Sequence, residues 1–208
     1  MKKTLAGIKY SLYVLSHPID GFYRIRFENA GNLISCFVLL VALVASFICK
    51  ESYTGFIFTE TDPRDFNVLW TIANVLVPVV LWCVANWSIT VLMDGCGRFI
   101  DIFMATVYAT VPLTATTFLN VILSRWLAQD EQTFLSIIMY IGVFLTGLLL
   151  FMGMLTIHQF TVLRTVFALI LTLIGMVFIV FLALLFASVM DQLIGYITSV
   201  ITEIKLRM

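Results

Sequence analysis

Five long runs of apolar residues alternate with polar segments along the chain. The runs cover 33–49, 68–90, 102–123, 134–155 and 166–189. The shortest has 17 residues, which at about 1.5 Å per residue reach roughly 25 Å, just enough to cross a thin hydrocarbon core. The pattern therefore predicts an all-α polytopic integral membrane protein with a five-helix transmembrane bundle.

The two ends of the chain show a different pattern. Residues 3–16 and 191–204 each place apolar side chains on one helical face and polar ones on the other, and both stretches are too short to span a bilayer. We expect interfacial amphipathic helices at both termini. The predicted organisation is an interfacial segment over 1–31, a membrane domain over 32–190 and an outer amphipathic helix over 191–208.

The segment 93–101 separates the second and third apolar runs. It is too short to cross a bilayer and too polar to lie inside one, so the runs on either side must form an antiparallel helical hairpin. Asp94-Gly95 is typical of a turn, and Asp101 stands where it can cap the third spanning helix.

Composition supports the membrane assignment. Apolar and aromatic residues make up 62% of the chain and charged residues 12%, with a mean hydropathy of +1.07, whereas soluble domains are about 25% charged. The formal net charge is zero, so no basic surface indicates a nucleic-acid partner. The four cysteines form no CxxC pair, and we interpret them as free thiols.

Basic residues concentrate before the first span, where Lys2, Lys3, Lys9, Arg24 and Arg26 all fall within the first 31 residues. The positive-inside rule then predicts a cytoplasmic N-terminus and, with five spans, an outer C-terminus. The later loops carry too few basic residues to add to this argument.

Proline and polar residues within the second and third spans permit two interpretations. A helix bent at a proline frees a backbone carbonyl, and two such helices could line a substrate pathway, as in transporters with broken helices. The same polar groups could instead hold helices together. No charged residue lies inside a span, which argues against ion-coupled transport. The candidate pathway residues are Asn74, Pro78, Asn86, Tyr108, Thr110 and Pro112.

Distinctive polar residues fall on the predicted cytoplasmic side, near both histidines of the chain. They lack the spacing of metal ligands, and no nucleophile lies near a base in the sequence, so we predict no metal, no cofactor and no enzymatic activity. We interpret them as an interaction surface. The candidates are Asp94, Gly95, Gly97, Arg98 and Asp101, with His17, Asp20, His158 and Arg164 as neighbours.

Three stretches carry a family resemblance: HPIDGFYRIRFENAG over 17–31, NWSITVLMDGCGRFIDIFMATVYATVP over 86–112 and TIHQFTVLRT over 156–165. They resemble the Yip1 domain family, specifically its bacterial branch. The resemblance implies five membrane helices, a cytoplasmic N-terminus and residence in the cell's inner (plasma) membrane. Eukaryotic relatives engage small GTPases of the Rab type, but their DLYGP motif does not occur in this sequence, so that activity is not carried over.

For the bacterial branch, the resemblance implies a membrane adaptor or a component beside transport machinery. Our leading hypothesis is a non-enzymatic adaptor or auxiliary subunit that binds another integral membrane protein or transporter complex. The alternative is a channel or small-molecule permease, and a third hypothesis is membrane shaping by the terminal helices. Membrane lipids are expected partners, and assembly into a homo-oligomer is left open.

Overall fold

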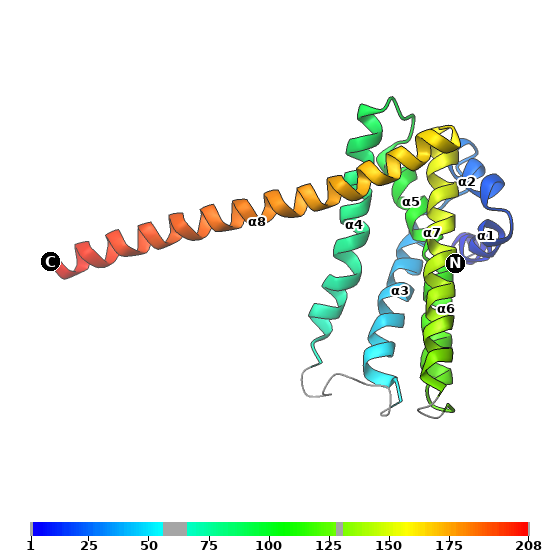
Figure 1. Cartoon of the computed structure of the whole chain (residues 1–208), viewed down its shortest axis with the longest axis horizontal. Coiled ribbons are helices and arrows are strands. Elements are labelled where there is room, and N and C mark those ends of the chain that lie inside the picture. Colours follow the sequence, from blue (N-terminus) through cyan, green and yellow to red (C-terminus); the bar gives the residue numbers. More distant parts are fainter. Residues whose placement is uncertain (1, 56–65, 128–130, 208) are drawn as a thin grey trace.

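The computed structural model describes residues 2–55, 66–127 and 131–207, and within these ranges the regular structure is helical, without a strand (Figure 1). The helices are α1 (Lys2–Ser16), α2 (Pro18–Phe27), α3 (Leu33–Tyr53), α4 (Val68–Leu92), α5 (Phe99–Ala109), α6 (Val111–Leu123), α7 (Gln132–His158) and α8 (Val162–Arg207). The all-α fold class is confirmed.

Within the described residues, five helical segments are long and apolar enough to cross a membrane. They are α3, α4, α5 together with α6, α7 and α8. Asparagine side chains cap the N-termini of α3 and α4. Asn32 accepts a hydrogen bond from the backbone N–H of Ile34 at 3.1 Å, and Asn67 accepts one from the backbone N–H of Leu69 at 3.0 Å. The predicted number of spans is confirmed.

The third span is divided at Thr110. Helix α5 ends at Ala109, and α6 begins with Val111 and Pro112 in its first turn, the position where the missing proline N–H is tolerated. The sequence predicted a bend at Pro112, and the structure has an interruption of the helix there. Helix α4 runs through Pro78 as one element.

Helix α5 lies at the centre of the molecule. It contacts α3, α4 and α7 as well as both N-terminal helices, and Met104 to Thr110 are all buried. Phe22 and Ile25 of α2 are fully buried in the same core, together with Ile102 and Ile157. The two N-terminal helices therefore extend the protein core at the end of the bundle that also holds the α4–α5 and α7–α8 connections (Figure 1). We call this end the loop end.

Helix α1 packs through its small face. Gly7, Ser11 and Val14 are buried, whereas the leucines Leu12 and Leu15 are exposed. A small face lets a helix approach its protein neighbours closely, and an apolar face turned outward suits contact with lipid. The apolar face that the sequence predicted over residues 3–16 therefore turns Leu12 and Leu15 outward, away from the bundle.

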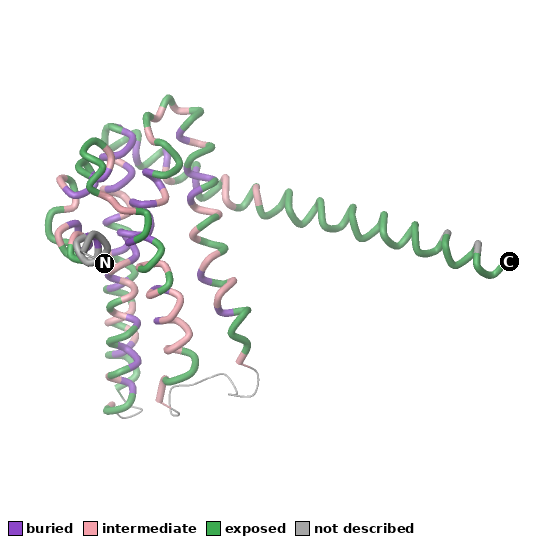
Figure 2. Tube along the Cα trace, turned by 180° about the vertical axis from the view of Figure 1, so that it is seen from behind, coloured by how far each residue is buried: buried purple, intermediate pink, exposed green. Residues whose placement is uncertain are grey.

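Helix α8 corrects one expectation from the sequence. The last span was expected to end near Val189, before a separate amphipathic helix over 191–208, but α8 is a single helix of 46 residues. Its middle has no proline, and Gly195 is the only glycine after Gly175, so nothing ends the helix at the expected boundary. Helix α8 crosses α4 and then extends away from the bundle, where its residues are exposed (Figure 2).

Candidate functional site

The α4–α5 connection forms a tight turn at the loop end. Asp94 adopts a left-handed conformation with φ of 55°, which aspartate tolerates better than most residues. The next residue, Gly95, donates its backbone N–H to the carbonyl of Thr90 at 2.7 Å, closing the C-terminus of α4. The structure confirms the turn predicted at Asp94-Gly95.

Asp101 is a fully buried carboxylate at the start of α5. Its Oδ2 accepts hydrogen bonds from the backbone N–H of Arg98 at 3.3 Å, from Arg98 Nε at 3.0 Å and from Arg26 Nη1 at 3.2 Å. A buried carboxylate is stable only with such partners. The predicted capping role of Asp101 is confirmed, and the hydrogen bond that Arg98 donates to Asp101 raises the pKa of the Arg98 guanidinium, which stays charged.

Arg26 of α2 belongs to this site, although from the sequence it was predicted only to be one of the basic residues that set the topology. Besides its bond to Asp101, which lies 75 positions away, Arg26 donates a hydrogen bond to the carbonyl of Cys96. Its neighbour Arg24 pairs locally with Asp20 at 2.9 Å. A buried aspartate requires a cation nearby, and that requirement is the signal that could have directed attention to the arginines of α2.

His158, the last residue of α7, packs against the α4–α5 turn. The ring is buried and stacks on Phe160 with centroids 5.3 Å apart, and its Nδ1 accepts the backbone N–H of Gly97 at 3.3 Å. Nδ1 therefore carries no proton in this arrangement. A Cβ on Gly97 would lie 2.5 Å from His158 Cε1, and one on Gly95 would lie 2.8 Å from Nδ1. The imidazole explains why both positions are glycine.

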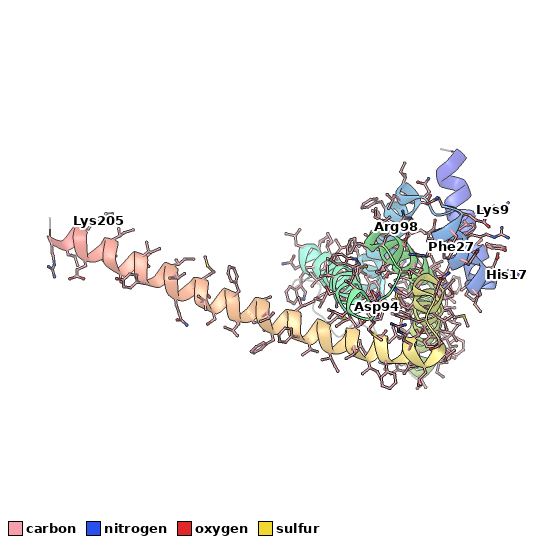
Figure 3. The ribbon with its side chains drawn as sticks, turned by 90° about the horizontal axis from the view of Figure 1, so that it is seen from above. Lys9, His17, Phe27, Asp94, Arg98 and Lys205 are labelled. Atoms are coloured by element: carbon pink, nitrogen blue, oxygen red, sulfur yellow. The ribbon has the colours of Figure 1, made fainter. Side chains whose placement is uncertain are left out.

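Arg164 of α8 fixes the outer side of the turn. Its guanidinium lies 4.6 Å from the Phe160 ring centroid, donates a hydrogen bond to the carbonyl of Met93 and lies 4.0 Å from the Asp94 carboxylate. The Asp94 side chain is 98% exposed and that of Arg98 is 66% exposed. Two exposed side chains of opposite charge, both labelled in Figure 3, therefore lie on a turn whose backbone is held by contacts from α2, α7 and α8.

Seven of the nine predicted interaction residues meet at this turn, and the other two do not. His17 lies at the outer edge in Figure 3, where it stacks on Tyr13 with centroids 5.2 Å apart. Asp20 accepts a hydrogen bond from the Tyr13 hydroxyl. Nearby, Tyr10 donates to the carbonyl of Gly21 at 2.8 Å, and burial raises the pKa of Tyr10 to about 12. His17 and Asp20 thus belong to the α1–α2 corner.

The six predicted pathway residues lie in separate places. Asn74, Pro78 and Thr110 line a groove of about 420 Å³ between α3, α4 and α6. Asn86 is buried and donates a hydrogen bond to Thr172 of α8 at 3.2 Å, and Tyr108 is fully buried in the central core. Pro112 is buried in the first turn of α6. The structure therefore brings half of this set together.

Within the described ranges, no three His, Cys, Asp or Glu side chains are placed to hold a metal ion. The cysteines Cys36, Cys49, Cys83 and Cys96 are all free thiols.

The helical spans and the charged turn together define a multi-pass helical membrane protein. The family model for the Yip1 domain matches residues 12–185, most of the chain, and the chain therefore belongs to the Yip1 domain family. The match includes the three stretches that carried the resemblance. Proteins of this family act in membrane trafficking and protein interaction and are generally non-enzymatic. No curated protein and no solved structure matches the chain.

Proposed function

We propose that the protein is a non-enzymatic adaptor or auxiliary subunit that binds another membrane protein complex, such as a transporter, through its loop end. The supporting observation is the construction of the α4–α5 turn. Contacts from α2, α7 and α8 hold its backbone, yet the side chains of Asp94 and Arg98 remain exposed.

A surface fixed before binding loses little conformational entropy when a partner arrives, and this favours affinity. Exposed charges of opposite sign on a rigid turn add selectivity, because a partner must place its own charges in the matching order. The helix faces could add contact area, since α8 is apolar and exposed over most of its length.

The orientation is part of the proposal. The five basic residues before α3 favour a cytoplasmic loop end in the inner (plasma) membrane. Cys96 is exposed on the turn, whereas Cys36 and Cys83 are buried. In intact cells, an impermeant thiol reagent should therefore leave Cys96 unlabelled until the membrane is opened, and labelling of Cys96 in sealed cells would contradict the orientation.

The binding proposal is tested by site-specific photocrosslinking in native membranes. A crosslinker at position 96, where the native cysteine side chain is exposed on the turn, should capture a reproducible membrane protein, and a crosslinker at position 207, at the far end of α8, is the control and should not capture that protein. The substitution Asp94→Asn keeps a residue that tolerates the left-handed backbone but removes the charge. It should abolish capture from position 96, and undiminished capture in this variant would refute the proposed surface.

A permease is the second candidate, supported by the groove that Asn74, Pro78 and Thr110 share. The buried positions of Asn86 and Tyr108, each engaged with other helices, favour packing over a common pathway. Solute flux into proteoliposomes that disappears with Asn74→Leu would favour the permease over the adaptor.

A further inference from the structure

The groove between α3, α4 and α6 is lined by the C-terminal half of α3 and the N-terminal half of α4. Helix α3 ends and α4 begins at the end of the bundle opposite the loop end (Figure 1). Its volume of about 420 Å³ is in the range of small-molecule sites. Apolar side chains dominate its depth, where it is lined by Leu43, Phe47, Val75, Val79 and Leu113.

Two adjacent charges stand at the mouth of the groove. Glu51 is fixed, because its carboxylate accepts a hydrogen bond from the hydroxyl of Thr71 on the facing helix. Lys50 lines the groove and has no ion-pair partner among the residues that the structure describes. Lys50 thus brings a cationic side chain to the groove beside a carboxylate whose position is set by Thr71.

Polar groups continue one helical turn deeper. Asn74 follows Thr71 by three residues on α4 and lines the groove. Pro78 has no N–H to donate to the carbonyl of Asn74, four residues back, so the backbone there is less satisfied than elsewhere in α4. The Asn74 side-chain amide can donate a hydrogen bond to a group bound in the groove.

We propose that this groove binds one phospholipid with an ethanolamine headgroup. Lys50 holds the phosphate, Glu51 accepts a hydrogen bond from the primary ammonium, and Asn74 donates to an ester carbonyl while an acyl chain lies against Val75 and Val79. An anionic lipid would lack the cation that Glu51 requires, and a choline headgroup has no N–H to donate. The order of the two charges thus selects a zwitterionic lipid with a primary amine.

The first test is native mass spectrometry of the detergent-purified full chain with an equimolar mixture of phosphatidylethanolamine, phosphatidylglycerol and phosphatidylcholine of identical acyl chains. The native chain should retain phosphatidylethanolamine preferentially, and Lys50→Gln should reduce that retention about tenfold, as loss of one charge-assisted hydrogen bond predicts. Glu51→Gln should remove the preference among headgroups. Equal retention of the three lipids by the native chain would overturn the proposal.

Matched variants separate the groove from general effects. Arg125→Gln removes a cation that follows α6, at the same end of the bundle, but does not line the groove, and it should leave retention unchanged. Val79→Trp fills the groove and should remove the bound lipid, whereas Val80→Trp changes the next residue, which is 53% exposed and not part of the lining. Equal loss in Val79→Trp and Val80→Trp, or in Lys50→Gln and Arg125→Gln, would refute the site.

Discussion

The substitution Asp101→Asn tests how the α4–α5 turn is held. It preserves the shape of the side chain but removes the charge that Arg26 and Arg98 share at 3.2 Å and 3.0 Å. Asp101 is fully buried and the Arg26 side chain is 14% exposed, so two guanidinium groups are left facing a neutral amide. The turn should lose its ion pair to α2 and keep the hydrogen bond that Arg26 donates to the carbonyl of Cys96.

The size of the effect follows from the burial of each partner. Removing one member of a fully buried ion pair costs about 3–5 kcal/mol. Here Arg98 can turn its exposed guanidinium into solvent, and the asparagine oxygen still accepts one bond, so we expect about 2–4 kcal/mol. For a chain of this size the loss lowers the melting temperature by roughly 5–15 °C.

The assay is thermal unfolding of the purified protein in detergent, followed by intrinsic fluorescence. Asp94→Asn is the control, because it removes an exposed carboxylate of the same turn. A double-mutant cycle with Arg26→Gln should give a coupling of about 1–3 kcal/mol. If Asp101→Asn destabilises the protein no more than Asp94→Asn does, or if the cycle shows no coupling, the buried ion pair does not hold the turn.

Two further predictions concern the same end of the molecule. Gly97→Ala should destabilise the fold by about 1–3 kcal/mol, because its Cβ would collide with His158. The control is Gly147→Ala, whose Cβ would meet nothing within 4 Å and which should be neutral or stabilising in the same melting assay. Equal effects of the two substitutions would contradict the role given to His158. The pKa of Tyr10 is about 12 in the fold against 10 in the unfolded chain, so the folded state holds the phenol proton more tightly. The contribution of this proton to the free energy of unfolding is therefore complete below pH 10 and is lost between pH 10 and 12. Tyr10→Phe should make the alkaline loss of stability less steep over that interval, and an unchanged slope in a pH series of melting curves would refute the assignment.

The spans, the hairpin between α4 and α5, the cap at Asp101 and a local disturbance of the helix at Pro112 could be predicted, because each depends on residues close together in the sequence. Hydrophobic run length sets a span, and proline or aspartate acts within one helical turn. The contacts of Arg26 with Asp101 and of His158 with Gly97 join residues 75 and 61 positions apart. These contacts depend on how the helices pack, which local patterns do not specify.

Helix faces were harder to predict for a reason specific to membranes. In water an apolar stripe marks the buried side of a helix, but in a bilayer apolar side chains also suit the lipid-facing side, while small and polar ones mediate helix contacts. Helix α1 shows this, with Gly7 and Ser11 buried and Leu12 exposed. Helix α8 follows the same rule, because its small residues Ala168 and Thr172 are buried and Gly175 lies beside Ile89 of α4.

The unbroken course of α8 has a mechanical consequence. At about 1.5 Å per residue its 46 residues extend roughly 70 Å, more than twice a hydrocarbon core. Where α8 packs on α4, the side chain of Asn86 donates a hydrogen bond to the hydroxyl of Thr172. From there the backbone of Asn86 is tied to the Thr90 hydroxyl at 2.7 Å, and the Thr90 carbonyl holds Gly95. These hydrogen bonds connect α8 to the exposed turn through Asn86 and Thr90, so a tilt of α8 relative to α4 would strain the contacts that shape the turn.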